Sequence, residues 1–330
     1  MKAARISAAL STALLCAAGV AWSQATSTAP GQAYPNRPVR VIVPFPPAGA
    51  NDIVARIVFP KLSEQMGQSF IIDNRAGAGG TIGSAVVAQS KPDGYTLLIQ
   101  TAASHVSNAH IYKKLPYDPL RDFVGVTPLA RVVAVLTVHP SLPAYSVKEF
   151  IALAQRRPGE ILHGHSGNGS FTHFNGLLFE SRADIRMTHV PFKGGGPAVI
   201  ALVSGETQAQ VAAIGELIAH IKSHRVRALG VTSLERVPQL PDVPLIADTL
   251  PGYESWTWVS AFAPAGTPRA IVDRLNAELG KAMNDPDVAA RLNAQTLDPA
   301  HRPPEELDQR LKSDNEMIGS LFRKLDMKPE

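Results

Sequence analysis

Short apolar runs alternate with stretches of helical periodicity along the first third of the chain. The β-branched run Val39–Val43 ends at a loop rich in proline and glycine, and apolar residues then recur at helical spacing from Ile53 to Leu62. Two further units follow, with strands predicted over 70–73 and 95–101 and helices predicted from Thr81 and over 102–108. Strands that alternate with helices predict mostly parallel sheets, covered by helices on both faces.

A second series of strand and helix units begins at the apolar run Val132–Val138. After a predicted helix over 146–156, strands predicted over 161–165, 188–192, 207–213 and 227–232 are interleaved with helices from Ser170 and Pro197. The segment 234–252 is rich in proline and predicts an irregular connection. It precedes an apolar stretch over 256–263 and three helices that begin near Pro268, Asp285 and Pro303. Two such series predict an α/β protein with two domains.

The first residues have the layout of a secretory signal peptide. Two basic residues precede the apolar run 6–20, which ends in small residues. We predict a Sec-type signal peptide over 1–23, cut between Ser23 and Gln24, then a flexible lead-in over 24–36, and therefore a periplasmic protein. The apolar run is shorter than the ~20 residues of a membrane-spanning helix. A leucine precedes Cys16, which disfavours lipid attachment at that cysteine.

Composition narrows the class of protein without indicating an activity. The 330 residues are 45% hydrophobic and 18% charged, with a single cysteine. These values exclude a disordered chain, a disulfide scaffold and a zinc site built from cysteines. The net charge of +4 comes from basic and acidic residues spread along the whole chain, which argues against a nucleic-acid partner.

Two motifs approach catalytic or cofactor signatures but depart from them. The glycines of 77–83 miss the dinucleotide spacing, because the third falls at 83 where the motif requires 82. Residues 164–168 resemble a nucleophile elbow around Ser166, but Asn168 stands where the motif requires glycine. A serine hydrolase using Ser166 therefore stays an alternative to a binding protein. We predict no enzymatic activity, no catalytic residue and no cofactor.

Histidines at 163, 165, 173 and 189 raise the question of a metal site. The first two share one face of a predicted strand. No HExxH motif, cysteine pair or acidic cluster accompanies them in the sequence, so we interpret them as isolated histidines and predict no metal. A zinc-binding exported protein stays an alternative.

Several loops that connect the carboxyl end of a strand to the start of a helix offer polar groups suited to binding an anion. Residues 46–52, 101–108, 166–171 and 193–197 are rich in Gly, Ser, Thr or Asn. Free backbone N–H groups and the helix dipole favour a carboxylate at such positions, by about 0.3–1 kcal/mol per exposed helix. No acid–base pair accompanies these loops, so the pattern predicts capture of an organic anion without its conversion. The sequence Val-Pro-Phe occurs at 43–45 and again at 190–192, which predicts two similar half-sites facing each other across a cleft.

Several stretches resemble the Bug family of tripartite tricarboxylate transporter substrate-binding proteins, which are TctC-like. They are YPNRPVRVIVPFPPAGANDIVAR (34–56), NRAGAGGTIG (74–83), PDGYTLL (92–98), YKKLPYDPLRDF (112–123), SGNGSFTH (166–173), VPFKGGGPA (190–198), VRALGVTSLERVPQLPDVP (226–244), LPGYESWTW (250–258) and APAGTP (263–268). The resemblance covers residues 34–330 and implies a two-lobed periplasmic-binding-protein fold of the Venus-flytrap, type II-like kind. The chain would cross between the lobes twice, with lobe 1 over 37–131 and 247–330 and lobe 2 over 132–246.

The resemblance also implies a function. A small organic carboxylate would be held in the cleft between the lobes, commonly through ordered waters, and presented to the membrane permease subunits of a tripartite tricarboxylate transporter. A sensor that signals to a membrane kinase would have the same fold, so that alternative stays open. We expect a monomer and no nucleic-acid partner.

Carried over position by position, the resemblance implies ligand contacts from both lobes. Lobe 1 would supply Phe45, Ala48, Gly49, Asn51, Asp52, Thr101 and Ser104, and lobe 2 would supply Ser166, Asn168, Gly169, Ser170, Phe171, Lys193, Gly194, Gly195 and Glu216. For Lys193, pairing with a ligand carboxylate and a surface role both stay open.

Departures from the family pattern bear on the identity of the ligand. The usual PFPPGGGTD is PFPPAGAND at 44–52, which adds side chains to a loop that is normally rich in glycine. Phe171 stands where a small or polar residue is frequent, and its ring is suited to stack on an aromatic ligand or to fill the hinge side. Ala212 and Glu216 replace an Asp and a Ser, and a carboxylate at 216 facing the cleft would repel a second ligand carboxylate. We therefore predict a monocarboxylate, an amino acid or an aromatic acid or amide, in preference to citrate.

Overall fold

The computed structural model describes residues 34–327 and residue 329, so the predicted signal peptide and most of the predicted lead-in lie outside the described residues. Residues 35–330 form one unit. The strands are β1 (Val39–Val43), β2 (Phe70–Asn74), β3 (Thr96–Thr101), β4 (Phe123–Val138), β5 (Leu162–His165), β6 (Thr188–Pro191), β7 (Ala209–Ala213), β8 (Arg227–Val231), β9 (Trp256–Pro264) and β10 (Leu297–Pro299). The helices are α1 (Ala50–Met66), α2 (Thr81–Ala88), α3 (Ala102–Ile111), α4 (Val147–Arg156), α5 (Phe171–Ala183), α6 (Gly195–Ser204), α7 (Ile214–Lys222), α8 (Arg269–Met283), α9 (Pro286–Ala294) and α10 (Pro304–Lys324), with the short 3-10 turns η1 (Ala78–Gly80) and η2 (Ile246–Asp248).

The strands form a mixed sheet in the order β2-β1-β3-β9-β4-β7-β5-β6, with β8 and β10 also paired to β4. β1 is parallel to β2 and β3, and β5 is parallel to β6 and β7, as the alternating pattern predicts. β9 is antiparallel to β3 and β4, and β4 is also antiparallel to β7, β8 and β10. The α/β class is confirmed, but the sheet is parallel only in its outer parts. An apolar strand buried on both faces does not reveal its direction, so the sequence could not predict the antiparallel centre.

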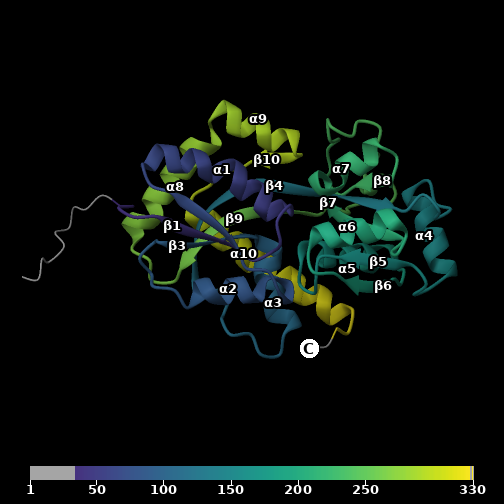
Figure 1. Cartoon of the computed structure of the whole chain (residues 1–330). Coiled ribbons are helices and arrows are strands. Elements are labelled where there is room, and N and C mark those ends of the chain that lie inside the picture. Colours follow the sequence, from purple (N-terminus) through teal and green to yellow (C-terminus); the bar gives the residue numbers. More distant parts are fainter. Residues whose placement is uncertain (1–33, 328, 330) are drawn as a thin grey trace, which may run out of the picture. The chain divides into compact units, whose positions relative to one another are not determined.

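Strand β4 connects two halves of this sheet. Its residues 123–133 pair with β9 and its residues 134–138 pair with β7, and Figure 1 shows it running from one half to the other. We call the part with β1, β2, β3, β9 and β10 the first sheet half and the part with β5 to β8 the second sheet half. The change of partner lies close to the predicted lobe boundary at 131/132, which stays a prediction.

The sequence predicted only the end of β4, because glycine and proline interrupt its beginning. Gly125 and Pro128 are residue types that are depleted in strands, so the pattern emerged only from Val132 onward. The pairing with β9 shifts in register between Gly125 and Thr127 and again between Pro128 and Ala130. Irregularities of this kind let a strand accommodate such residues without ending. Helix α7 and strand β10 were also not predicted.

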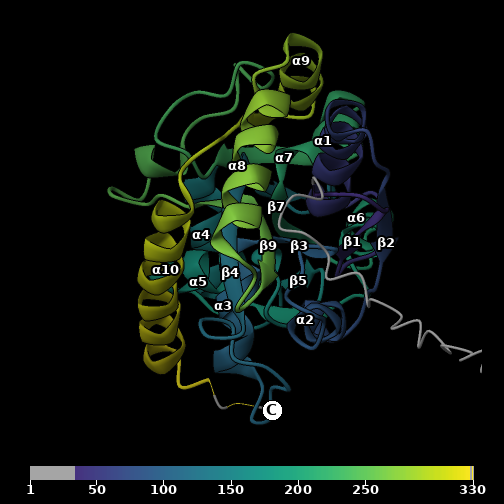
Figure 2. The same ribbon diagram turned by 90° about the vertical axis from the view of Figure 1, so that its left-hand side faces the viewer.

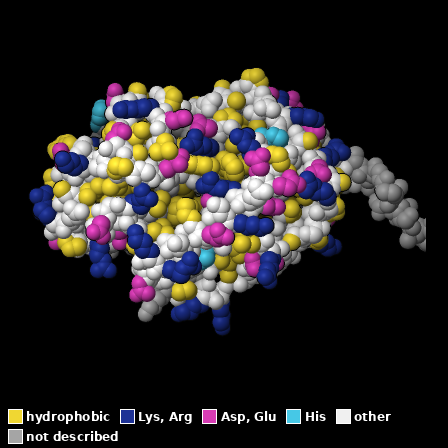
Figure 3. All heavy atoms as spheres, turned by 180° about the vertical axis from the view of Figure 1, so that it is seen from behind, with side chains coloured by type: hydrophobic (Ala, Val, Ile, Leu, Met, Phe, Trp, Pro, Cys, Tyr) yellow, Lys and Arg dark blue, Asp and Glu magenta, His cyan; other side chains and the backbone are white. Residues whose placement is uncertain are grey.

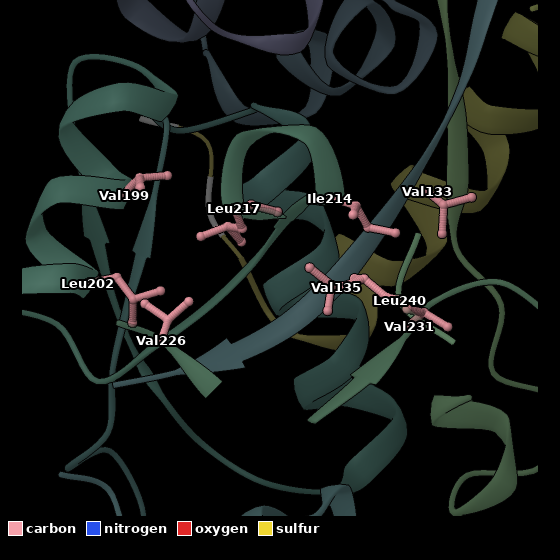
Figure 4. Packing of buried hydrophobic residues seen from close by; sticks show 10 residues of the cluster. Val133, Val135, Val199, Leu202, Ile214, Leu217, Val226, Val231 and Leu240 are labelled. Atoms are coloured by element: carbon pink, nitrogen blue, oxygen red, sulfur yellow. The ribbon is translucent and has the colours of Figure 1, made fainter. Parts of the chain in front are cut away.

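Aliphatic side chains from β4 and two helices form a core in the second sheet half (Figure 4). Val133 and Val135 lie on the same face of β4, since side chains two residues apart point the same way. They are clustered with Val199, Leu202, Ala212, Ile214, Leu217, Val226, Val231 and Leu240. Burial of each large aliphatic side chain stabilises the fold by roughly 1.5–3 kcal/mol. The core therefore anchors α6 and α7, whose first residues contribute to the site described below.

The C-terminal helices pack mainly on the first sheet half. α8 packs against α1 and β4, while α10 packs against α3 and β4 and also contacts α5 (Figure 2). Over residues 34–327, none of the helices has the length and apolar character needed to cross a membrane. Figure 3 shows basic and acidic side chains interspersed over the face opposite that of Figure 1.

Candidate functional site

Five helices begin around one small cavity. α1, α3, α5, α6 and α7 follow β1, β3, β5, β6 and β7, and both sheet halves contribute. Their first residues and the preceding loops enclose about 30 Å³, which we call the inner cavity. It is lined by Phe45, Gly49, Ala50, Asn51, Thr101, Ser104, Ser166, Ser170, Phe171, Thr172, Gly195, Ala213 and Glu216. This volume is close to that of one water molecule in the liquid, so a metabolite can enter only when the surrounding loops separate.

The helix starts at the inner cavity differ in how their backbone N–H groups are satisfied. In α3 the Ser104 N–H donates to Thr101 Oγ1 at 3.3 Å, and in α5 the His173 N–H donates to Ser170 Oγ at 3.2 Å. At the starts of α1, α6 and α7 no backbone N–H donates to a capping side chain. Their N–H groups are donors suited to an anion.

A network of hydroxyl groups forms the wall contributed by the loop 166–172. Thr172 Oγ1 accepts a hydrogen bond from the Ser166 N–H at 2.8 Å and shares hydrogen bonds with Ser166 Oγ at 2.8 Å and Ser170 Oγ at 3.0 Å. Across the cavity, Thr101 Oγ1 donates to Ser104 Oγ at 2.8 Å. The sequence analysis missed Thr172, although its hydroxyl stands in the same polar stretch as the two serines.

The carboxyl group of Glu216 lies at the inner cavity, between the starts of α1 and α6. The Ala50 N–H at the start of α1 donates to Glu216 Oε1 at 3.3 Å. Oε2 is buried and has no hydrogen-bond partner among the described residues. Burial raises the pKa of Glu216 to about 7, and the bond from Ala50 acts in the opposite direction. The group therefore exchanges its proton near neutral pH.

A second acceptor at the inner cavity also lacks a donor. Asn51 is 6% exposed, and its Oδ1 is buried without a hydrogen-bond partner among the described residues. A buried acceptor without a donor costs roughly 1–3 kcal/mol. Asn51 Oδ1 and Glu216 Oε2 are thus two acceptors for which a bound molecule can supply hydrogen atoms.

A larger outer cavity of about 570 Å³ adjoins the inner one and shares Phe45 and Ser166 with it. It is lined by Phe45, Pro46, Ala76, Gly77, Ala78, Gly79, Gly80, Tyr112, Ser166, Gly167, Asn168, Pro191, Phe192, Lys193 and Gly194. Three aromatic rings and few charged groups make this wall suited to an apolar or aromatic part of a ligand. Lys193 is exposed at this cavity, away from the inner one.

The two Val-Pro-Phe loops meet at the outer cavity, in agreement with the prediction that they face each other. A side chain at 194 would place its Cβ 2.6 Å from Pro46 Cγ, so the loops approach too closely for any residue but glycine. Gly79, with φ +59°, approaches the loop 166–172 in the same way, since a Cβ there would lie 1.9 Å from Asn168 O. The glycine-rich stretch 77–83 thus serves close contact between loops.

Three predicted ligand contacts line neither cavity: Ala48, Asp52 and Gly169. Asp52 fixes the loop after β1 instead. Its carboxylate accepts hydrogen bonds from the Ala48 N–H at 3.0 Å, Asn74 Nδ2 at 3.0 Å and Arg56 Nε at 2.8 Å. Burial acts to raise the pKa of Asp52, but these hydrogen bonds outweigh it and hold the pKa below its ordinary value. We therefore interpret Asp52 as a residue that positions the loop.

The interpretation of the histidines as isolated was wrong. His165, His173 and His189 each offer a ligand atom, and these atoms all lie within 4.8 Å of one another. Burial lowers the pKa of His165 to about 3 and that of His173 to about 2, so both rings are neutral at pH 7. Among the described residues, the hydroxyl of Ser166 is hydrogen-bonded to Thr172 and to no histidine, which does not favour a hydrolase.

A family model and several known proteins match this chain. Residues 54–327 match the family model described as tripartite tricarboxylate transporter family receptor, TctC. A protein of Pseudomonas sp. strain P51, named UPF0065 protein in tcbD-tcbE intergenic region, is 42% identical over 92% of this chain and 92% of its own length. Protein BugT of Bordetella pertussis is 34% identical over 89% of this chain and 92% of its own length.

Solved structures of related binding proteins share the fold. Rpa4515 of R. palustris, described with adipate, has a TM-score of 0.86 and 33% identity, and covers 90% of this chain and 100% of its own. MatC from Rhodopseudomonas palustris, described with bound malate, has a TM-score of 0.83 and 32% identity, and covers 87% of this chain and 99% of its own. The structure of periplasmic binding protein BugD has a TM-score of 0.84 and 29% identity, and covers 90% of this chain and 100% of its own.

These similarities confirm the periplasmic-binding-protein fold and a solute-binding role. The family is one of receptors and not of enzymes, which confirms the prediction that the protein is not an enzyme. The chain belongs to the tripartite tricarboxylate transporter family of receptors, the TctC family.

Proposed function

We propose that this receptor captures a small monocarboxylate that also carries an amino or amide group, with an aromatic part as its favoured remainder, in preference to citrate. The observation that carries the proposal is the pair of buried acceptors at the inner cavity, Glu216 Oε2 and Asn51 Oδ1, which lack donors among the described residues. An ammonium or amide group supplies the missing hydrogen atoms. A second carboxylate supplies none and is repelled when Glu216 is ionised.

The single carboxylate of the ligand would bind at the loop 166–172. The hydroxyls of Ser166, Ser170 and Thr172 would provide its donors. Waters that bridge the carboxylate and these groups would cost little affinity. Phe45 and the outer cavity would receive the aromatic part.

The relatives that are described with adipate or malate hold dicarboxylates. We expect this chain to differ from them because of Glu216, whose carboxyl group already accepts a hydrogen bond at the start of α1. One anionic group of the protein thus occupies a position that a second ligand carboxylate would otherwise use.

A pair of probes that differ by one amino group tests the ligand class. Calorimetry should find phenylalanine bound more tightly than 3-phenylpropanoate, and citrate and adipate bound weakly. Because Glu216 ionises near pH 7, the affinity for phenylalanine should rise about tenfold from pH 6 to pH 8. Glu216→Gln should remove this rise, while the exposed control Glu206→Gln should keep it.

Tight binding of citrate or adipate, with no binding of amino acids or aromatic acids and amides in the same screen, would overturn the ligand class. If Glu216→Gln binds phenylalanine as tightly as the wild type at both pH values, Glu216 does not take part in ligand recognition. Neither result would alter the membership of the receptor family.

We further propose that the chain is exported to the periplasm as a monomer, with residues 1–23 removed, and delivers its ligand to a tripartite tricarboxylate-type permease. A periplasmic fraction should contain a chain whose mass corresponds to residues 24–330. Deletion of the gene should abolish uptake of labelled ligand. If uptake persists while a ligand-dependent transcriptional response is lost, the sensor alternative with a membrane kinase is correct.

A further inference from the structure

Three histidines form a cluster behind the loop 166–172 and line neither of the two cavities described above. His165 is the last residue of β5, His173 lies in the first turn of α5 and His189 lies in β6. Their ligand atoms lie within 4.8 Å of one another. The rings of His165 and His173 are stacked with centroids 4.3 Å apart, and His189 stands edge-on to His173 at 5.3 Å. We call these three residues the histidine cluster.

The hydrogen bonds of the cluster leave ring nitrogens unused. His189 Nε2 lies 3.0 Å from Glu180 Oε2, so the carboxylate accepts the Nε2 proton and Nδ1 keeps its lone pair. That Nδ1, and at least one ring nitrogen of His165, are buried without a partner among the described residues. His173 Nδ1 accepts only a long hydrogen bond, 3.3 Å, from the Gly169 N–H.

A histidine whose outer nitrogen donates to a carboxylate is a frequent arrangement at metal centres. The carboxylate fixes the tautomer and makes the inner nitrogen a stronger ligand. Glu180 has this relation to His189. Lone pairs of neutral imidazoles are preferred ligands of zinc, copper and nickel.

Solvent reaches His173 and His189 through a third cavity of about 760 Å³, which shares Asn168 and Pro191 with the outer cavity. Its wall includes His173, His189 and Glu180, together with His110 of α3 and Lys324 of α10. The cavity gives an ion a path from solvent and leaves room for a water molecule as a further ligand.

We propose that His165, His173 and His189 bind one divalent transition-metal ion, with Glu180 orienting His189 from behind. Three histidines and a water form a four-coordinate set that zinc accepts. With Zn–N bonds of 2.0–2.1 Å, ligand nitrogens in a tetrahedral site lie about 3.4 Å apart, so binding draws the nitrogens together by at most about 1.4 Å. An ion lies in the plane of each ring that binds it. One ring must therefore leave the stack, and His173 has the cavity beside it.

The position of the cluster gives metal binding a consequence for the ligand site. His165 and His173 flank the loop that carries Ser166 and Ser170. An ion that joins these two histidines fixes both ends of this loop, which reduces the entropy that ligand binding must overcome.

The test is calorimetric titration of the full, tag-free chain with zinc chloride after treatment with a chelator. We expect saturable binding of one ion per chain, and its loss in His173→Gln and His189→Gln. Glu180→Gln should weaken the affinity by about 10- to 100-fold, as expected for a carboxylate that orients a ligand. His110→Gln is the matched control, because His110 lines the same cavity but is hydrogen-bonded to Asn315 at 2.8 Å.

Spectroscopy supplies an independent readout and covers the case of a variant that fails to fold. The cobalt form of the wild-type chain should show the intense absorption of a tetrahedral site, and the copper form should show nitrogen couplings in its paramagnetic resonance spectrum. Near-ultraviolet circular dichroism reports whether each variant is folded. The proposal is overturned if the wild-type chain binds no zinc at one ion per chain, or if folded His173→Gln and His189→Gln bind it as the wild type and His110→Gln do.

Discussion

Replacement of Glu216 by glutamine should make the ligand-free protein more stable at high pH. The carboxyl group has an ordinary pKa of 4.5 that burial raises to about 7 in the folded chain. A raised pKa means that the contribution of this group to stability is complete below pH 4.5 and is lost as the pH rises to about 7. The whole shift corresponds to a loss of about 3 kcal/mol. Glutamine stays neutral and keeps an acceptor for the Ala50 N–H, so it avoids this loss.

Urea unfolding followed by tryptophan fluorescence measures the effect as a difference between variant and wild type. The stability advantage of Glu216→Gln should be small at pH 5 and should grow by about 2 kcal/mol at pH 8. The exposed control Glu206→Gln should show no such growth. An equal difference between Glu216→Gln and wild type at both pH values would refute the reasoning, because it would mean that the carboxyl group is hydrated in the folded protein.

Three further changes test the site and the fold. Thr172→Val keeps the shape of the side chain but removes the hydroxyl that joins the serines, so ligand affinity measured by calorimetry should fall about tenfold, whereas Thr172→Ser should retain it. Gly195→Ala would place a Cβ 2.6 Å from Glu216 Oε2 and should weaken ligand binding. Gly196→Ala meets no atom within 4 Å and should leave the affinity unchanged. Equal affinities of the two variants would contradict the close approach of α6 to Glu216. Burial lowers the pKa of His105 to about 4, so its contribution to stability is present above pH 6.5 and is lost as the pH falls to 4. The free energy of unfolding of His105→Gln should therefore be lower than that of the wild type at pH 7, and this deficit should shrink by up to about 3 kcal/mol by pH 4. A deficit that does not change with pH would contradict this prediction.

Local patterns predicted most elements of the fold but not their directions. The apolar run at β1 and the helical spacing of α1 were sufficient because both elements are regular and long enough to show their period. The start of β4 was missed because glycine and proline interrupt the apolar pattern there. The strand stays paired with β9 through two register shifts, which the sequence pattern does not predict. The prediction that loops before helices form an anion site rested on helix starts. Of the sixteen ligand contacts that the resemblance implied, thirteen line one of the two cavities: Phe45, Gly49, Asn51, Thr101, Ser104, Ser166, Asn168, Ser170, Phe171, Lys193, Gly194, Gly195 and Glu216.

The sequence was sufficient to predict the α/β class, the family and most of the polar residues at the inner cavity, because these depend on composition, period and motifs within short stretches. The roles of those residues depend on contacts that form only in the folded chain. In the folded chain, Asp52 accepts a hydrogen bond from the loop after β1, and the carboxyl group of Glu216 accepts one at the start of α1. Three histidines from separate elements lie in one cluster. Burial and hydrogen bonding at a site come from elements that are distant in sequence. These two factors decide at which pH Glu216 ionises and which histidine nitrogens have no hydrogen-bond partner among the described residues.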